Sequence, residues 1–249
     1  MTQSKVQGKA QGKTAIVFGG SRGIGAAIAQ QLAADGANVV ITYVSAPDRA
    51  SAVLAAIEQQ GVAGLAIKAD SSSAAELRDA VAQAAARFGR LDIVVVNAGI
   101  YHNEDVTTFD LEALDRMLAV NVRGVFLAIQ ASLAHMQRGG RIITMGSIAA
   151  HFTRYPGASV YSMSKAAVAT MAKGIAVDLA PRGITINNVQ PGPIETDMTA
   201  EIVEAIKSAV PLQRIGQAAE IAGFVSYLAS DAPSYMTGAS LTVDGGMSL

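Results

Sequence analysis

The chain has 249 residues, of which 51% are hydrophobic and 16% charged, and its 19 basic and 20 acidic residues leave a net charge of −1. Such a chain is too apolar to be disordered, and its balanced charge lacks the basic patch of a nucleic-acid-binding protein. The absence of cysteine excludes disulfides and thiolate metal sites. We expect a soluble, cytoplasmic protein without a membrane span, with extra apolar surface buried between subunits.

Short β-branched segments alternate with alanine-rich segments of helical periodicity. The predicted strands are Thr14–Phe18, Val39–Tyr43, Gly64–Lys68, Ile93–Val96, Arg141–Met145, Ile184–Val189 and Ser240–Val243. The predicted helices are Gly25–Asp35, Arg49–Gln60, Ala74–Phe88, Leu111–Met136 and Ser159–Leu179. This alternation indicates βα units that feed a parallel sheet. We predict one α/β domain over residues 1–249, a Rossmann fold whose doubly wound, parallel, seven-stranded sheet has helices on both faces.

The helix predicted over Leu111–Met136 has the clearest pattern. Leu111, Leu118 and Val125 belong to an apolar series spaced three or four residues apart, and Asp110 is placed to cap the first turn. We therefore predict one continuous helix here.

A glycine-rich segment follows the first predicted strand. It consists of Gly19, Gly20, Ser21, Arg22, Gly23, Ile24 and Gly25. Glycines let the backbone approach a pyrophosphate, whose charge meets the unpaired N–H groups of the next helix. Glycine clusters also form ordinary turns, but this one lies where doubly wound sheets bind dinucleotides. The segment therefore predicts a dinucleotide site.

The end of the second predicted strand indicates which dinucleotide binds. NAD enzymes usually place a carboxylate about 20 residues after the glycines to hold the ribose 2′-hydroxyl. Tyr43, Val44 and Ser45 stand there instead, with no acid before Asp48. Ser45 offers a hydroxyl to a 2′-phosphate and Arg22 a charge-assisted hydrogen bond, although Arg22 could also be a solvated surface cation. We predict NADP(H).

Two further turns follow the third and fourth predicted strands. Asp70 could accept a hydrogen bond from the adenine amino group, and Asn97, Ala98 and Gly99 leave room for the adenine ribose. Either turn could also be plain turn chemistry. We assign both turns to the cofactor site.

Tyr161 and Lys165 are four residues apart, so they share a face of a helix. A phenol with a pKa of about 10 is a poor acid–base group at neutral pH, but a nearby ammonium and a positive nicotinamide favour the phenolate. The alternative is a tyrosine packed over a lysine stem. If the pair is functional, Lys165 tunes the pKa of Tyr161 towards the working pH.

These motifs resemble those of the short-chain dehydrogenase/reductase family, in the same order. The matching residues are Gly19-x-x-x-Gly23-x-Gly25, Asn97-Ala98-Gly99, Asn121, Ser147, Tyr161-x-x-x-Lys165 and Pro191-Gly192. The similarity covers nearly the whole chain, from Gly12 to Gly246. It implies an NADP(H)-dependent enzyme similar to bacterial carbonyl reductases and 3-oxoacyl-(acyl-carrier-protein) reductases, assembled as a homotetramer or homodimer.

The resemblance implies catalytic roles for four residues. Ser147 would hydrogen-bond the substrate oxygen, and Tyr161 would give or take the proton. Lys165 would bind the nicotinamide ribose and lower the pKa of Tyr161, while Asn121 would hold a water that relays protons. Outside the motif set, Ser147 could be a solvated turn hydroxyl and Asn121 a helix residue facing solvent.

After Pro191 and Gly192, the resemblance implies that the Ile194 backbone and the Thr196 hydroxyl hold the carboxamide. Residues 195–210 form a predicted substrate lid, and residues 1–11 a predicted flexible tail.

The sequence also departs from the family pattern. Tyr161 lies 14 residues after Ser147, one more than is usual. The longer loop, with His151, Phe152, Arg154 and Tyr155, resembles the trihydroxynaphthalene-reductase branch. Phe18 and Val96 replace a usual threonine and asparagine, which we expect to change packing only.

We predict an oxidoreductase that acts on a ketone or quinone-like carbonyl or on a secondary alcohol. The alternatives are a 3-oxoacyl-thioester reductase and a non-catalytic nucleotide-binding sensor. His102, His135 and His151 lack metal-ligand spacing, so no catalytic metal is predicted.

Overall fold

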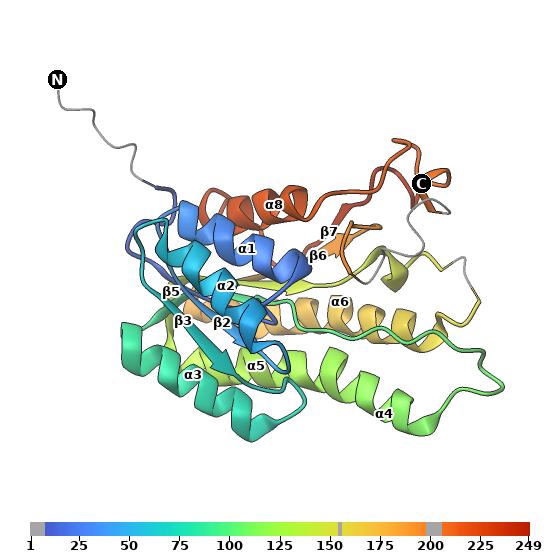
Figure 1. Ribbon diagram of the computed structural model, residues 1–249, viewed down its shortest axis with the longest axis horizontal. Coiled ribbons are helices and arrows are strands. Elements are labelled where there is room, and N and C mark those ends of the chain that lie inside the picture. The colour runs from blue at the N-terminus through green and yellow to red at the C-terminus, as the bar shows by residue number, and fades with distance from the viewer. Residues whose placement is uncertain (1–7, 154–155, 198–205) are drawn as a thin grey trace.

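A seven-stranded parallel sheet forms the centre of the molecule (Figure 1). The structure is a computed structural model that describes residues 8–153, 156–197 and 206–249. The strands are β1 (Thr14–Phe18), β2 (Asn38–Tyr43), β3 (Gly64–Lys68), β4 (Leu91–Val96), β5 (Met136–Met145), β6 (Thr185–Pro191) and β7 (Ser240–Val243). Their order is β3-β2-β1-β4-β5-β6-β7, and every neighbouring pair is parallel. Strand order therefore reverses between β1 and β4, where doubly wound folds bind ligands.

Helices cover both faces of the sheet, as predicted. One face carries α1 (Gly23–Ala34), α2 (Pro47–Glu58) and α8 (Ala218–Ser230), and the other carries α3 (Ala74–Phe88), α5 (Gly124–Ser132) and α6 (Ser159–Leu179). The remaining elements are α4 (Leu111–Leu118), the π turn η1 (Ala119–Arg123) and the short 3₁₀ turns η2 (Leu133–His135), η3 (Ile148–Ala150) and η4 (Ala180–Arg182).

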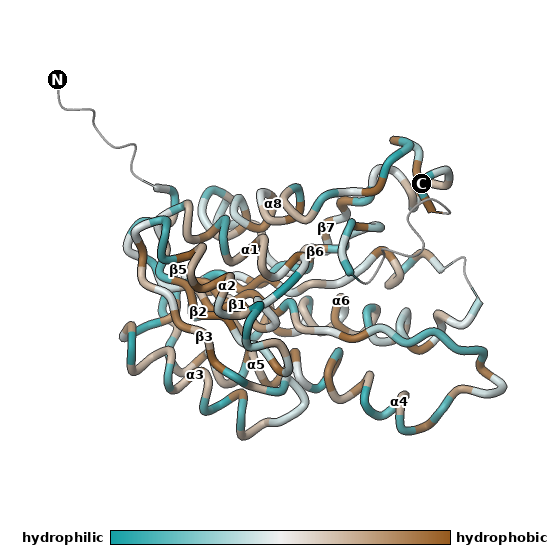
Figure 2. The backbone as a smooth tube through the Cα atoms, in the orientation of Figure 1, coloured by the Kyte–Doolittle hydropathy of each residue, from teal (hydrophilic) through white to brown (hydrophobic). Residues whose placement is uncertain are grey.

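The strands are apolar on both sides because both faces are covered. Alternate residues of β1 enter different cores: Ala15 and Val17 pack under α1 and α8, whereas Ile16 and Phe18 pack under α3 and α5. Figure 2 shows the same division, with hydrophobic backbone concentrated in the central strands and hydrophilic residues in the outer turns. The predicted fold class is confirmed, and all seven predicted strands are present.

The helix predicted over Leu111–Met136 is present as one helical stretch, Leu111–His135, but a π turn lies within it and Met136 is outside it. The described chain runs through α4, η1, α5 and η2, and Met136 begins β5 by pairing with Leu91. Asp110 does cap α4, by accepting a hydrogen bond from the Ala113 N–H at 2.8 Å. Leu111 is nevertheless 72% exposed. The π turn shifts the helical register, so the side of the helix that is buried changes along its length.

The helix α8 was missed by the sequence analysis. Its N-terminus has a capping box in which Gln217 and Glu220 satisfy each other's backbone N–H groups. The buried Ser226 hydroxyl on α8 donates to the Asp35 carboxylate at the end of α1, at 2.5 Å. This bond fixes α8 beside α1 on the sheet.

Part of the predicted tail is packed rather than extended. Residues 1–7 lie outside the described residues, but Ala10 is buried and its N–H donates to the Asp35 carbonyl at 2.8 Å. The predicted tail 1–11 is therefore too long.

One helical stretch, Leu111–His135, is long and apolar enough to cross a membrane by length and composition. Its α5 portion packs against α3 and β4 in the core of this fold. This packing accounts for its hydropathy.

Candidate active site

The predicted site residues gather at the carboxyl edge of the sheet, because parallel strands all end there. The glycine turn follows β1, Tyr43 ends β2, Asp70 follows β3, Asn97 follows β4, Ser147 follows β5 and Pro191 ends β6. Residues that are far apart in the chain thus border one region.

The glycine turn is shaped to let a ligand approach its backbone. Gly19 and Gly23 have positive φ angles of 74° and 52°. A Cβ atom at Gly19 would lie 2.8 Å from the Ala98 Cα, and one at Gly25 would lie 2.1 Å from the Gly19 carbonyl oxygen. Arg22, the N-cap of α1, makes no side-chain cap hydrogen bond. The first N–H groups of α1 therefore fit a pyrophosphate.

The Asn97–Gly99 turn lies between the glycine turn and the predicted catalytic residues Asn121 and Lys165. Asn97 Nδ2 donates to the Gly19 carbonyl at 2.7 Å, so its amide holds the glycine turn in place. A Cβ atom at Gly99 would lie 3.4 Å from Asn121 Oδ1 and 3.5 Å from Lys165 Nζ. Asn97, Ala98 and Gly99 thus hold the glycine turn on one side and lie close to Asn121 and Lys165 on the other.

Asp70 is held in place by residues that the sequence analysis did not identify. Its Oδ1 accepts from the backbone N–H and the hydroxyl of Ser72, both at 2.8 Å, and its Oδ2 accepts from Arg116 Nη2 at 2.9 Å. Burial opposes ionisation, but the hydrogen bonds from Ser72 and Arg116 outweigh it and keep the pKa of Asp70 below its ordinary value. Asp70 is therefore a fixed carboxylate acceptor at neutral pH.

The end of β2 lies against the glycine turn. Gly19 N–H donates to Thr42 Oγ1 at 3.0 Å, and Tyr43 is half-buried beside it. Arg22 and Ser45 are both exposed there. None of the residues Tyr43, Val44 and Ser45 is acidic, whereas an NAD enzyme usually has a carboxylate at this place.

The structure brings Ser147, Tyr161 and Lys165 together. Ser147 Oγ accepts from the Ala149 N–H at 3.1 Å, and the Ser147 side chain is a hydrogen-bonding neighbour of the Tyr161 phenol that lowers the pKa of that phenol. Lys165 Nζ lies 5.6 Å from the centre of the Tyr161 ring and donates to the Met145 carbonyl at 3.0 Å. Two hydroxyls thus meet in front of a buried ammonium group.

Asn121 lies in the π turn and is fully buried. Its Oδ1 accepts from the Ile100 N–H at 2.8 Å, and its Nδ2 donates to the Ile100 carbonyl at 2.9 Å and to Ser164 Oγ at 3.2 Å. The side chain therefore fixes the β4–α4 loop to α6. A relay water would have to use the backbone of the π turn, and this role stays a prediction.

The expected lowering of the Tyr161 pKa is wrong for the protein's own groups. Burial raises the pKa of Tyr161 to about 12, against the opposing effect of the Ser147 hydrogen bond, and Tyr101 raises it further. Burial also lowers the pKa of Lys165 to about 8. The spacing correctly placed Lys165 beside Tyr161. It could not show how far burial raises the pKa of Tyr161, because burial depends on the folded chain.

The segment after β6 closes over the glycine turn. Ile194 bridges to Gly216, and the Glu195 N–H donates to the Gly216 carbonyl at 2.9 Å. A Cβ atom at Gly23 would lie 3.3 Å from Thr196 Cγ2, so Thr196 lies beside the glycine turn, and its contact with the carboxamide stays a prediction. Of the predicted lid, residues 198–205 lie outside the described residues.

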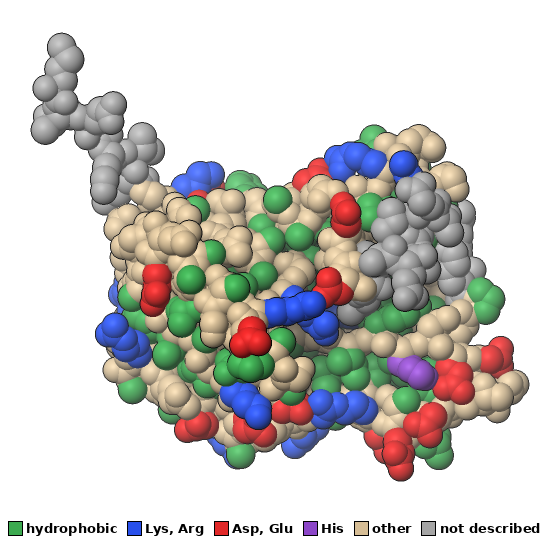
Figure 3. All heavy atoms as spheres, in the orientation of Figure 1, with side chains coloured by type: hydrophobic (Ala, Val, Ile, Leu, Met, Phe, Trp, Pro, Cys, Tyr) green, Lys and Arg blue, Asp and Glu red, His purple; other side chains and the backbone are tan. Residues whose placement is uncertain are grey.

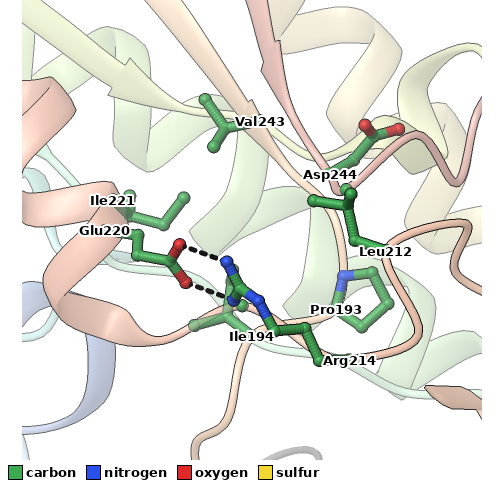
Figure 4. A pocket seen from close by; sticks show the side chains of 10 residues that line it. Pro193, Ile194, Leu212, Arg214, Glu220, Ile221, Val243 and Asp244 are labelled. Atoms are coloured by element: carbon green, nitrogen blue, oxygen red, sulfur yellow. Dashed lines mark hydrogen bonds and ion pairs between the residues drawn. The ribbon is translucent and has the colours of Figure 1, made fainter.

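A pocket lies beside this segment, on the α8 side (Figure 4). Ile194, Ile221 and Val243 are among its lining residues, and Arg214 forms two hydrogen bonds to Glu220, at 2.7 and 2.8 Å. Ser147, Tyr161 and Lys165 do not line it. The pocket and its ion pair thus flank the 193–196 segment rather than contain the reacting groups.

An apolar cluster lies next to Ser147. Ile148, Val210 and Met247 are buried together, and Phe152 and Ile206 pack against them. Arg154 and Tyr155, from the same predicted loop, lie outside the described residues.

The Tyr101 ring meets the Tyr161 ring edge-on with centroids 5.0 Å apart. Tyr101 was not identified from the sequence, where only its position after the Asn97–Gly99 turn could have indicated it.

Comparisons with known proteins agree with this arrangement. The profile of a family described as enoyl-(acyl carrier protein) reductase matches residues 19–248. A 3-oxoacyl-(acyl-carrier-protein) reductase of Staphylococcus aureus is 39% identical over 94% of this chain and 98% of its own length.

Solved structures give the same result. A short-chain dehydrogenase/reductase of Serratia marcescens is 52% identical, with a TM-score of 0.94 over 97% of this chain and 100% of its own. A short-chain dehydrogenase of Burkholderia cenocepacia in complex with NADP is 45% identical, with a TM-score of 0.94 over 96% and 99% of the two chains. The chain therefore belongs to the short-chain dehydrogenase/reductase family of oxidoreductases.

Proposed function

We propose that the protein is an NADP(H)-dependent reductase of ketones or quinone-like carbonyls, and that Tyr161 is its proton donor. The observation that carries this proposal is that Ser147, Tyr161 and the buried Lys165 lie together, with Lys165 Nζ 5.6 Å from the centre of the Tyr161 ring. Two hydroxyls that meet can both point at one substrate oxygen. Fixed donors aimed at an oxygen that gains negative charge lower the barrier to reaction.

Each residue has a separate task. The bound nicotinamide supplies the hydride to the carbonyl carbon, or accepts it in the reverse direction. Ser147 donates a hydrogen bond to the substrate oxygen, and Tyr161 transfers its phenolic proton to that oxygen. The carbonyl is thereby reduced to an alcohol. A pKa of about 12 keeps the Tyr161 phenol protonated at neutral pH, which suits the reductive direction.

Lys165 supports the phenolate left on Tyr161 after proton transfer. Its ammonium lies behind the ring, and its pKa of about 8 means that it is mostly charged at neutral pH. A positive charge at this distance favours the phenolate. Lys165 also faces Gly99, where it can reach the nicotinamide ribose.

The preference for NADP(H) is supported by the charges at the end of β2. Arg22 can donate to a 2′-phosphate, and the absence of a carboxylate on Tyr43–Ser45 avoids repulsion. The NADP complex of the Burkholderia cenocepacia relative also supports it.

Aromatic and apolar side chains support an apolar carbonyl substrate. The Tyr101 ring meets the Tyr161 ring edge-on, and Phe152 and Met247 pack in the cluster of Ile148, the residue after Ser147. The second candidate is a 3-oxoacyl thioester, which the Staphylococcus aureus relative favours. A non-catalytic sensor would have no use for Ser147 and Tyr161 beside a buried lysine.

We further propose a homotetramer or homodimer located in the cytoplasm. Phe126 on α5 and Met163 and Val177 on α6 are 45%, 48% and 74% exposed, which supports burial between subunits.

A substrate panel tests the proposed function. Purified protein is mixed with NADPH or NADH and with ketones, quinones, 3-oxoacyl thioesters or enoyl thioesters, and oxidation of the nicotinamide is followed by absorbance. We expect oxidation of NADPH by ketones or quinones. Tight nucleotide binding without oxidation by any compound would instead support the sensor, and reaction of the enoyl thioester alone would remove the carbonyl assignment.

A further inference from the structure

Arg49 and Asp197 join two segments that border the adenosine end of the site. Arg49 lies in the first turn of α2, four residues after Ser45. Asp197 directly follows Thr196, which faces the glycine turn. The Arg49 guanidinium forms a hydrogen-bonded ion pair with the Asp197 carboxylate, across 148 residues of sequence. Figure 3 shows basic and acidic side chains close together in the middle of this face.

Arg22 acts on the same carboxylate. The hydrogen bond and charge of Arg49 lower the pKa of Asp197, and the charge of Arg22 adds to the shift. One arginine, from α2, is thus paired with this carboxylate, and a second, from the glycine turn, is near enough for its charge to act on it. In doubly wound folds that bind dinucleotides, the ribose 2′ position lies near the end of the second strand, which in this chain directly precedes α2.

The ion pair is open to exchange with a stronger anion. The Arg49 and Asp197 side chains are 54% and 60% exposed, and exposed ion pairs contribute little net stability. A phosphate monoester carries about two negative charges at neutral pH and offers three acceptor oxygens. Arginine binds such a group through parallel hydrogen bonds more strongly than it binds one exposed carboxylate.

We propose that Arg49 is a second cation for the 2′-phosphate of NADP(H), and that the Asp197 carboxylate competes with that phosphate for it. The inference rests on the proposed NADP(H) function and adds a selectivity residue to it. NADH offers only a neutral 2′-hydroxyl, which cannot displace a carboxylate from an arginine. Competition by Asp197 thus affects NADP(H) and leaves NAD(H) unchanged.

The alternative is that the Arg49–Asp197 pair clasps the dinucleotide. A clasp would hold the parts that NADPH and NADH share, so breaking it would weaken both. The two arrangements therefore predict opposite effects of removing the carboxylate.

The test is a set of binding titrations with NADPH, NADH, 2′,5′-ADP and 5′-ADP, followed by fluorescence or calorimetry. The proteins are the wild type, Arg49→Gln, Asp197→Asn and the double variant. Arg87→Gln and Asp79→Asn on α3 are charge-matched controls, and thermal melting verifies that each variant folds.

For Arg49→Gln we expect the Kd for NADPH and 2′,5′-ADP to rise about tenfold, with NADH and 5′-ADP changed by less than about twofold. For Asp197→Asn we expect the Kd for NADPH to fall about threefold, and no such gain when Arg49 is already Gln.

Equal loss of NADPH and NADH binding in Asp197→Asn would overturn the inference in favour of a clasp. No effect of Arg49→Gln on 2′,5′-ADP would also overturn it. Because only binding is measured, a wild-type protein that binds neither dinucleotide would instead signal failure of the proposed function.

Discussion

The two ends of the proposed cofactor site are built differently. At the reaction end, Asn121 and Lys165 are buried and fixed by hydrogen bonds to Ile100, Ser164 and Met145. At the adenosine end, Arg22, Ser45 and Arg49 are exposed charged or polar groups. Proton transfer needs fixed geometry and low solvent access, whereas the choice of dinucleotide needs only charges that can exchange partners. Changes at the two ends should therefore have separable effects.

The largest expected effect tests the reaction end. Tyr161→Phe removes the transferable proton and keeps the ring beside Tyr101, so kcat should fall on the order of 10³-fold. The Kd for NADPH should stay within about twofold of wild type, since the adenosine end is untouched. Steady-state kinetics and a binding titration measure the two quantities. A comparable loss of binding would mean that the two ends are not separable.

A second change at the reaction end concerns the charge of Lys165. Its pKa of about 8 is lowered by burial, so the ammonium is present below that pH and is lost as the pH rises through it. Reduction should therefore slow above pH 8 in the wild type. Lys165→Met should lower kcat on the order of 10²-fold and abolish this pH dependence. Retention of the same inflection in the variant would assign it to another group.

A substitution of Arg22, which we assign to the 2′-phosphate, tests the adenosine end of the site. Arg22→Ala should raise the Kd for NADPH roughly tenfold, because a charge-assisted hydrogen bond is lost, and leave kcat nearly unchanged. NADH should be affected much less. Equal weakening of both cofactors, measured in parallel titrations, would contradict the assignment of Arg22 to the phosphate.

Arg116 offers a matched change in the part of the site that both cofactors share. Arg116→Met removes the bond to Asp70 and should raise the Kd for NADPH and NADH alike, by roughly threefold to tenfold, because adenine is common to them. Arg116→Lys should recover part of the loss. An effect on kcat alone would place the role of Arg116 elsewhere.

Ionic strength should give the smallest effect. Salt screens exposed charges more than buried ones. Raising the salt concentration should therefore weaken the binding of NADPH more than that of NADH, by roughly threefold. The ratio of kcat between the wild type and Tyr161→Phe should not change. Titrations at low and high salt measure this difference. Identical salt dependence for the two cofactors would argue against a phosphate site made of exposed arginines.

The sequence predicted the parts of this molecule that depend on local pattern. Short apolar segments, most of them rich in β-branched residues, identified the seven strands of the described sheet, and the spacing of Tyr161 and Lys165 placed both on one helix. The glycine turn was found because its backbone angles require glycine at Gly19 and Gly23.

The parts that were missed depend on contacts between distant segments. The π turn ends next to Gly124, where the backbone approaches the Ser71 carbonyl so closely that a Cβ atom would lie 2.3 Å from its oxygen. The local sequence pattern does not reveal this contact. Arg116 and Arg49 reach partners 46 and 148 residues away. The Tyr161 pKa was misjudged for the same reason, since burial is a property of the folded chain.

The most direct test of the central claim is a single turnover with NADPH carrying deuterium at the transferable position of the nicotinamide. The protein is mixed with a reactive ketone in ordinary water, and the product is analysed by mass spectrometry and NMR. The account predicts one deuterium on the carbinol carbon with the wild type, and with Tyr161→Phe the same transfer slowed on the order of 10³-fold, although the variant binds NADPH nearly as well. Full deuterium transfer by Tyr161→Phe at the wild-type rate would contradict the claim that this phenol supplies the proton.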